Sequence, residues 1–274
     1  RQMTRKVKMF FINIIFLLVI IYICINIVIY FSQRKLLYHP TENNYLDENS
    51  LNHKIEKIYI PSENKLLGWY FKKNENYKTL LFFHGNAGRL ENRIYKLNHF
   101  PKLDLNYLIF AYRGFSGNNG KPTEEGIYKD SRAVINWLDS KGIKKKDIIL
   151  YGESLGGAVA IEIAQDESYA GIILESPFTS MEKAAKIYYP YLPVKLLLKD
   201  KYKTDEKILN VNSPILVMHG EKDKIVPVSY FLEAKEFFIK NQYEIETKIF
   251  KNCEHRIPSE GSSIGLDFIK RNLY

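Results

Sequence analysis

The feature that most restricts this chain is an uncharged, apolar stretch near its N-terminus. From Phe10 to Phe31, 22 residues carry no charge. At a rise of about 1.5 Å per residue, a helix over this stretch is about 33 Å long, which matches the roughly 30 Å hydrocarbon core of a bilayer. Arg34 and Lys35 follow soon after, in place of the small residues of a signal-peptidase site. Residues 10–31 are therefore predicted to be one uncleaved transmembrane anchor.

The charges on either side of the anchor predict its orientation. The flank at residues 1–9 holds four basic residues, whereas the two basic residues after the anchor are soon diluted by Glu42, Asp47 and Glu48. Cytoplasmic flanks of membrane helices are usually the more basic ones. We therefore expect a cytoplasmic N-terminus, with the folded domain that follows the anchor on the non-cytoplasmic side.

Composition excludes several other classes of protein. Hydrophobic residues make up 46% of the chain and charged residues 26%, which is typical of a packed globular protein. The net charge of +9 falls to +5 without the basic N-terminal flank, so nucleic acid is not an expected partner. The two cysteines, Cys24 and Cys253, are too few and too far apart for a disulfide framework or a Cys-rich zinc site.

The order of short apolar runs predicts the fold class. Three β-like runs follow one another without helices, and five later runs alternate with amphipathic, helix-like segments. Continuous apolar centres such as Leu80-Phe83 and Ile215-Met218 indicate strands that are buried on both faces. We therefore expect an α/β domain over residues 36–274 with a mostly parallel eight-stranded sheet, an antiparallel beginning and helices on both faces. The β-like runs are Lys57-Ile60, Leu66-Phe71, Thr79-Phe83, Tyr107-Ala111, Asp147-Tyr151, Gly171-Glu175, Pro214-His219 and Glu244-Phe250, and the helix-like segments are Leu90-Phe100, Glu124-Ser140, Leu155-Gln165, Ser229-Lys240 and Ile264-Arg271.

One glycine-rich motif stands between a predicted strand and a predicted helix. It reads Gly152-Glu153-Ser154-Leu155-Gly156-Gly157. Gly-x-Ser-x-Gly in this setting is the pattern of the nucleophile elbow, in which a serine on a tight, strained turn projects its hydroxyl above the sheet. The glycines leave room for that turn. Ser154 is therefore the predicted nucleophile.

A serine hydroxyl needs a base, and the base needs an orienting acid. In the elbow fold these follow the serine in the order acid, then histidine. Asp223 stands after the run Pro214-His219 and is the predicted acid, with Glu221 and Glu175 as alternatives. His255, which follows the last β-like run, is the only histidine after the acid and is the predicted base.

The oxyanion of an acyl-transfer reaction needs backbone N–H donors. One normally comes from the residue after the nucleophile and one from a loop after an earlier strand. The sequence predicts Leu155 and Asn86 for these two positions, and His84 as a residue that braces the Asn86 loop.

Two other patterns are rejected. Gly114 to Pro122 looks like a phosphate-binding loop, but its spacing is one residue too long and Pro122 stands where a Ser or Thr would bind Mg²⁺. Cys253 and His255 lack a second ligand pair for zinc. We expect neither a cofactor nor a metal.

With these residues in place, the chain resembles the membrane-anchored serine hydrolases of the α/β-hydrolase superfamily. It is most similar to the α/β-hydrolase-domain-containing branch that includes protein depalmitoylases. The motifs that carry the resemblance span nearly the whole domain: Leu36-Leu-Tyr-His-Pro40, His84-Gly-Asn-Ala-Gly88, Tyr112-Arg-Gly-Phe-Ser-Gly117, Gly152-Glu-Ser-Leu-Gly-Gly157, Glu175-Ser-Pro-Phe178, His219-Gly-Glu-Lys-Asp223 with Val226-Pro227, and His255.

The resemblance implies a membrane-anchored enzyme that cleaves an acyl ester or thioester, including that of a lipid or an acylated protein, through an acyl-enzyme intermediate. A peptidase or amidase of the same fold and an inactive, membrane-tethered binding module stay open as alternatives. The stretch at about residues 178–206 is rich in apolar and aromatic residues. It can form a cap over the nucleophile that buries an acyl chain, or it can pack as ordinary core helix against the sheet.

Overall fold

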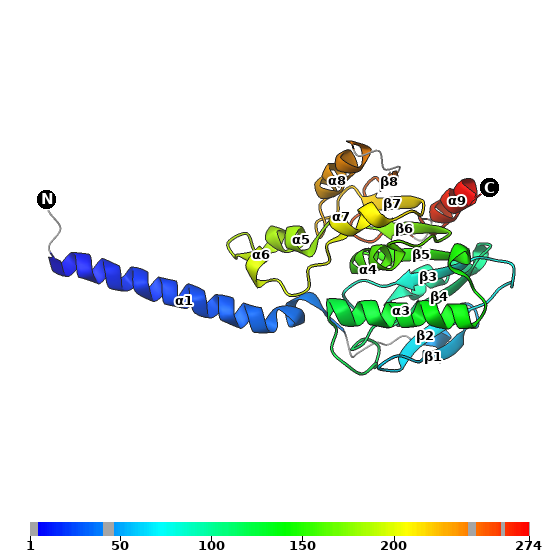
Figure 1. Ribbon diagram of the computed structural model, residues 1–274, viewed down its shortest axis with the longest axis horizontal. Coiled ribbons are helices and arrows are strands. Elements are labelled where there is room, and N and C mark those ends of the chain that lie inside the picture. The colour runs from blue at the N-terminus through cyan, green and yellow to red at the C-terminus, as the bar shows by residue number, and fades with distance from the viewer. Residues whose placement is uncertain (1–4, 41–46, 241–244, 259–260, 274) are drawn as a thin grey trace.

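One eight-stranded sheet organises the protein (Figure 1), and the computed structural model describes residues 5–40, 47–240, 245–258 and 261–273. The strand order is β1-β2-β4-β3-β5-β6-β7-β8. β2 pairs antiparallel with β1 and β4, and every other neighbouring pair is parallel, as predicted. The strands are β1 (Glu56–Ile60), β2 (Leu66–Phe71), β3 (Thr79–Phe83), β4 (Asn106–Phe110), β5 (Ile148–Glu153), β6 (Gly171–Glu175), β7 (Ile215–Gly220) and β8 (Ile245–Phe250).

These eight strands lie where the sequence predicted them, with bounds that differ by at most two residues. The predicted first residue of the last strand, Glu244, lies outside the described residues, as do Arg1 and Glu42. All five residues of β3 and all five of β4 are buried. Burial on both faces explains why their sequences are continuous apolar runs rather than alternating ones.

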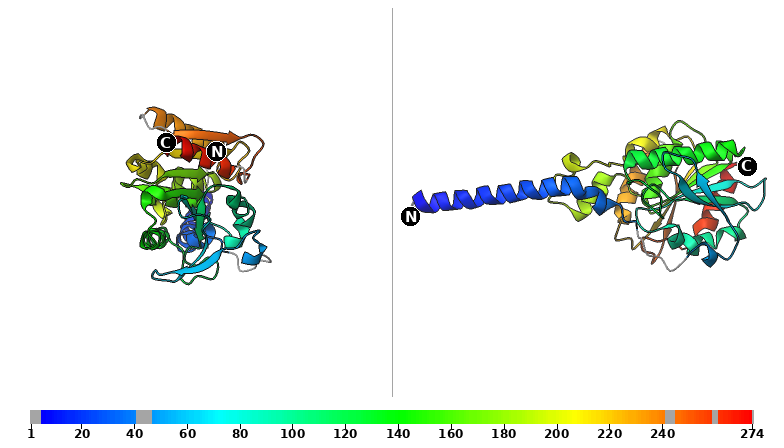
Figure 2. Two further views of the ribbon diagram at one scale, coloured as in Figure 1. Left: turned by 90° about the vertical axis from the view of Figure 1, so that its right-hand side faces the viewer. Right: turned by 90° about the horizontal axis from the view of Figure 1, so that it is seen from below.

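Helices cover both faces of the sheet, as Figure 2 shows for α3 (Glu124–Ser140) and α9 (Gly261–Leu273). Successive side chains of β6 point to opposite faces of the sheet, so they contact different helix layers. A Cβ added to Gly265 of α9 would lie 2.5 Å from the Ile173 side chain, whereas Gly157 of α4 (Leu155–Ala164) lies against Leu174. α8 (Val228–Lys240) packs on β7 and β8.

The predicted helix over residues 90–100 is wrong as a single element. The segment is divided into a 3-10 turn, η2 (Leu90–Arg93), the short helix α2 (Ile94–Leu97) and a second 3-10 turn, η3 (Phe100–Lys102). Pro101 stands in the first turn of η3 and has no N–H to donate to a continuing α-helix. Two further 3-10 turns are η1 (Glu48–Ser50) and η4 (Lys145–Asp147).

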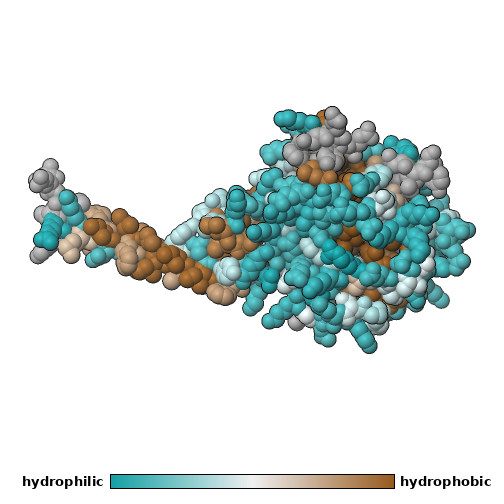
Figure 3. All heavy atoms as spheres, in the orientation of Figure 1, coloured by the Kyte–Doolittle hydropathy of each residue, from teal (hydrophilic) through white to brown (hydrophobic). Residues whose placement is uncertain are grey.

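The apolar N-terminal stretch forms α1 (Arg5–Leu37), which extends well beyond the rest of the protein in Figures 1 and 2. Its part from Val7 to Leu37 is long and apolar enough to cross a membrane. Figure 3 shows hydrophobic side chains along most of this helix and again on the segment beside its C-terminal end. The helix is longer than predicted because it continues through Arg34 and Lys35 to Leu37.

The segment beside α1 is the insertion between β6 and β7, defined here as residues 178–206. It contains α5 (Met181–Tyr188), α6 (Val194–Leu197) and most of α7 (Thr204–Lys207), which leads into the turn η5 (Ile208–Asn210). Met181, Leu192 and Val194 are buried, but Tyr191 is 69% exposed and Leu196 is 83% exposed. The insertion is therefore not packed throughout as core helix against the sheet.

Candidate active site

Ser154 occupies a strained turn at the carboxyl end of β5. Its backbone angles are φ 52° and ψ −112°, which non-glycine residues rarely adopt. Two backbone hydrogen bonds hold it there: its N–H donates to the Glu175 carbonyl at 2.8 Å, and its carbonyl accepts from the N–H of Gly157 at 2.9 Å. α4 begins at the next residue, Leu155, so Ser154 stands at the N-terminal end of that helix.

The glycines around Ser154 are required by close backbone packing. A Cβ on Gly156 would lie 2.0 Å from the carbonyl oxygen of Phe83 in β3. A Cβ on Gly152 would lie 2.5 Å from the carbonyl oxygen of Gly156. Both gaps are far shorter than a van der Waals contact, so no other residue fits at either position without moving the backbone.

Asp223 and His255 form a direct hydrogen bond. The ring Nδ1 of His255 lies 2.8 Å from Asp223 Oδ2, and the Asp223 side chain is fully buried. The other carboxylate oxygen, Oδ1, accepts from the N–H groups of Ile225 and Val226, each at 2.8 Å. These bonds fix the carboxylate, which in turn orients the imidazole.

His219 is a second imidazole beside the same carboxylate, and its role was not predicted from the sequence. Its Nε2 lies 3.3 Å from Asp223 Oδ2 and 2.7 Å from the carbonyl oxygen of Val226. Burial alone would raise the pKa of Asp223, but hydrogen bonds from His219, His255 and the Val226 N–H outweigh it and hold the pKa well below its usual range. The carboxylate is therefore charged at neutral pH.

The segment at the end of β6 connects the serine to the histidine. The carbonyl of Glu175 receives the N–H of Ser154, and the hydroxyl of the next residue, Ser176, donates to the carbonyl of His255 at 2.8 Å. In the described part of the chain, the Ser154 hydroxyl makes no hydrogen bond to the imidazole. Such contacts are often long in enzymes without substrate and tighten when substrate binds.

The two alternative acids have other partners. Glu221 lies at the surface, where its side chain accepts from the Asn252 N–H at 3.2 Å. Glu175 is buried and accepts from the Ile257 N–H at 3.1 Å, two residues after the predicted base. The carboxylate that reaches the His255 ring is thus that of Asp223.

A buried charge network lies on the other side of Glu175. The Lys96 ammonium, fully buried, pairs with Glu175, which also accepts from the Tyr151 hydroxyl. Glu153, next to the elbow serine, pairs with Arg93 at 2.7 Å and lies 3.8 Å from Lys96. Burial alone would lower the pKa of Lys96, but the neighbouring Glu175 raises it well above its usual value. The same cations lower the pKa of Glu153 to about 2 against the opposing effect of burial.

The loop that holds Asn86 follows β3 and is braced from two sides. His84 is buried; its Nδ1 lies 2.7 Å from the Gly85 carbonyl, and its Nε2 accepts from the Tyr112 N–H at 3.3 Å. Burial lowers the pKa of His84 to about 3, so the ring is neutral. From the other side, the Asn86 carbonyl accepts from the His39 N–H at 2.9 Å, and the Asn86 side chain donates to the Leu37 carbonyl at 2.7 Å. The predicted bracing by His84 is thus present, together with a second tie to the end of α1.

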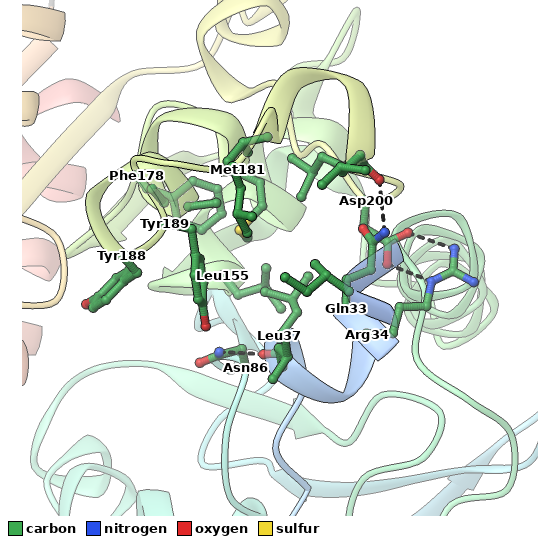
Figure 4. Close-up of a pocket in the computed structure, with 18 of the residues that line it drawn as sticks. Gln33, Arg34, Leu37, Asn86, Leu155, Phe178, Met181, Tyr188, Tyr189 and Asp200 are labelled. Atoms are coloured by element: carbon green, nitrogen blue, oxygen red, sulfur yellow. Dashed lines mark hydrogen bonds and ion pairs between the residues drawn. The ribbon is translucent and has the colours of Figure 1, made fainter. Parts of the chain in front are cut away.

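Ser154, Leu155 and Asn86 line a cavity of about 440 Å³. Most of its other lining residues come from α1 and from the insertion, with Ile225 and Val226 from the loop after β7, and the walls are mostly apolar (Figure 4). Figure 4 shows Phe178, Met181 and Tyr189 on the side of the insertion, opposite Leu37 and Gln33 of α1. A hydroxyl on a strained turn therefore lies at the wall of an apolar space large enough for a substantial ligand.

Both rejected motifs lie in turn and loop segments. Residues 114–118 form a turn in which the Gly114 N–H donates to the Asn118 carbonyl at 3.1 Å, and the Asn118 side chain donates to Ala111. The Cys253 carbonyl accepts from the Lys222 N–H at 2.8 Å. Among residues 5–40, 47–240, 245–258 and 261–273, no group of three His, Cys, Asp or Glu side chains is arranged to hold a metal ion.

Comparison with known proteins places the chain among α/β hydrolases. The family model described as phospholipase/carboxylesterase matches residues 105–273, and that of the Chlamydia CHLPS protein matches residues 5–172. An uncharacterized protein of Mycobacterium tuberculosis is 35% identical over 206 residues, 73% of each chain. The human alpha/beta hydrolase domain-containing protein 17B is 31% identical over 180 residues, 63% of this chain and 60% of its own. The crystal structure of a Pyrococcus furiosus esterase superposes with a TM-score of 0.69 at 20% identity, covering 87% of this chain and 98% of the esterase.

Proposed function

Because this chain belongs to the phospholipase/carboxylesterase family of α/β hydrolases, we propose that it is a membrane-anchored serine hydrolase that cleaves an acyl ester or thioester. One observation carries the proposal. A serine in a strained turn faces an apolar cavity, at the carboxyl end of the sheet, where the buried Asp223 carboxylate is hydrogen-bonded to the His255 ring at 2.8 Å. This combination supplies a nucleophile, a base and space for an acyl chain.

In the proposed mechanism, Ser154 attacks the acyl carbon while His255 takes its proton. Asp223, charged and held by two backbone N–H groups, keeps the His255 ring in the tautomer that accepts on Nε2 and stabilises the imidazolium that forms. The N–H groups of Asn86 and Leu155 stabilise the oxyanion. His255 then protonates the leaving alcohol or thiol, and water releases the acyl group from Ser154 by the same steps in reverse order.

The helix α1 is the proposed anchor, with the N-terminus in the cytoplasm and the hydrolase domain on the other side of the membrane. Its length and apolar composition support anchoring, and the basic residues Arg5, Lys6 and Lys8 before the apolar stretch support the orientation. Protease added to sealed cells whose outer envelope, if present, has been permeabilised should digest the hydrolase domain. Complete protection of that domain would show that the orientation is the opposite one, with the hydrolase domain in the cytoplasm.

Labelling with a fluorophosphonate tests the proposed chemistry. The full chain in detergent should be labelled covalently at Ser154, and Ser154→Ala should abolish both labelling and ester hydrolysis. A panel of matched esters, thioesters and amides then separates an esterase from a peptidase or amidase. An unlabelled, inactive wild-type protein that binds acyl chains would instead indicate a binding module.

A further inference from the structure

Most of the wall of the cavity beside Ser154 comes from two segments that are far apart in sequence, the end of α1 and the insertion. Ile29, Gln33, Leu36 and Leu37 of α1 line it opposite apolar side chains of the insertion. A helix that served only as a tether would not need to contribute side chains to the wall of this cavity. The inference that follows rests on the proposed function, because it concerns the acyl group that this cavity would hold.

Polar contacts fasten the insertion to α1. The Gln33 side chain donates to the Leu197 carbonyl at 2.9 Å and accepts from the Lys199 N–H at 2.8 Å. Arg34 makes two bonds to the buried Asp200 carboxylate, at 2.9 and 3.0 Å. A bidentate pair of this kind fixes direction as well as distance. The wall that α1 contributes is therefore held in register with the insertion.

One contact shows how far the insertion reaches along α1. The Tyr22 hydroxyl donates to the Tyr191 carbonyl at 3.0 Å. Tyr22 precedes the end of the predicted span, Phe31, by nine residues, so it lies about 13 Å along the helix from that end. If α1 crosses a bilayer, Tyr191 lies beside the part of the helix that is in the hydrocarbon region.

An unpaired backbone N–H is costly in lipid, and eight of the ten residues from 189 to 198 either donate their N–H to a carbonyl or are proline. The N–H groups of six residues donate to carbonyls within the insertion, and Pro190 and Pro193 have no N–H at all. The exposed side chains here include Tyr191 and Leu196, and the long stem of Lys195 allows its ammonium to reach the headgroups. The six donors are residues Tyr189, Leu192, Val194, Leu196, Leu197 and Leu198.

We propose that α1 is a wall of the acyl-binding site and that the site takes long acyl chains directly from the leaflet around α1. The substrate class is a long-chain ester or thioester whose acyl chain already resides in the bilayer. An acyl chain that enters between α1 and the insertion meets Ser154 at the inner end of the cavity without passing through water.

A pair of substitutions on neighbouring residues of α1 tests this proposal. Ile29 is half-buried and lines the cavity, whereas Val28 is 65% exposed on another face of the helix. We expect Ile29→Trp to fill part of the acyl space and to lower the ratio of kcat/KM for a 16-carbon ester to that for a 4-carbon ester at least tenfold. Val28→Trp, the matched control, should leave this ratio within twofold of wild type. Because the ratio is internal to each protein, loss of folded enzyme does not alter it.

The second measurement uses the full chain reconstituted in vesicles. Labelled diacyl phospholipid and an S-palmitoyl peptide are each supplied either in the bilayer that holds the enzyme or in separate vesicles. We expect hydrolysis of one or both at least tenfold faster in the shared bilayer, and the faster substrate identifies the source of the chain. If short esters are cleaved but the 16-carbon to 4-carbon ratio is equal in Ile29→Trp and Val28→Trp, the inference is overturned. Equal rates in shared and separate vesicles would overturn it as well. Absence of all ester cleavage and of fluorophosphonate labelling would overturn the proposed function itself.

Discussion

Two buried carboxylates stand near the ends of neighbouring strands, and their partners differ. Asp223, after β7, is hydrogen-bonded to the rings of His255 and His219. Glu175, at the end of β6, is paired with the Lys96 ammonium and the Tyr151 hydroxyl. Imidazole can gain and lose a proton near neutral pH, whereas a buried, paired ammonium keeps its charge. This difference supports the proposal that the β7 carboxylate assists proton transfer, whereas the β6 carboxylate stabilises the structure around the site.

The largest expected effect is on catalysis at the β7 carboxylate. Asp223→Asn should lower kcat/KM for a short ester by about 10⁴, because the amide holds His255 in the wrong tautomer. Steady-state kinetics on the full chain in detergent measure this. Glu221→Gln is the matched control, since Glu221 lies on the same loop but at the surface, and it should keep most of the activity. If Glu221→Gln lost its activity and Asp223→Asn kept it, the orienting acid would be Glu221 and not Asp223.

At the β6 carboxylate, the expected effect is on stability. Lys96→Met leaves Glu175 buried without its cation and should destabilise the protein by about 3–5 kcal/mol, which lowers the melting temperature by roughly 10 °C. The double variant Lys96→Met/Glu175→Gln should recover part of this loss because no unpaired charge is left. Glu175→Gln alone should keep most of its activity per folded molecule. If it lost activity as Asp223→Asn does, the division between the two carboxylates would be wrong.

The smallest expected effect is on the stability of the network in acid. The pKa of Glu153 is lowered from 4.5 to about 2, so the folded protein gains stability above pH 4.5 and loses it as the pH falls towards 2. The size of this contribution is on the order of 3 kcal/mol. Melting temperatures between pH 6 and pH 2 should therefore fall less steeply for Glu153→Gln than for wild type. An unchanged slope would show that the network does not carry the acid sensitivity.

The parts of the fold and site that follow local rules were predictable from the sequence. Continuous apolar runs located the strands, and the glycines around Ser154 located the turn because close backbone packing admits no other residue. Asp223 and His255 follow a strand order that places both at one edge of the sheet. Their hydrogen bond agrees with that prediction, while their catalytic roles stay predictions.

The parts that depend on long-range partners were not predictable. Lys96 and Arg93 belong to a segment that was predicted to be amphipathic, where charged residues normally face water, and nothing local indicates that Lys96 is fully buried. The order acid, then histidine, does not point to His219, which precedes the acid in sequence, and its place beside Asp223 depends on how the following loop turns back. The contacts of Gln33 and Arg34 with the insertion join residues more than 160 positions apart, for which no spacing rule exists.

The tie between α1 and the Asn86 loop has a consequence for the rotation of the helix. Leu37, the last residue of α1, and His39 just after it are hydrogen-bonded to that loop. Tyr22, which lies fifteen residues before Leu37 on the helix, is hydrogen-bonded to Tyr191 of the insertion. One residue inserted between Tyr22 and Leu37 would turn everything before it by about 100° and shift it by about 1.5 Å. Tyr22 would then face away from the insertion, although the helix would be no less apolar. The sequence of α1 therefore specifies an angular position as well as a hydrophobic length, and an anchor of equal hydrophobicity is not equivalent unless it keeps that phase.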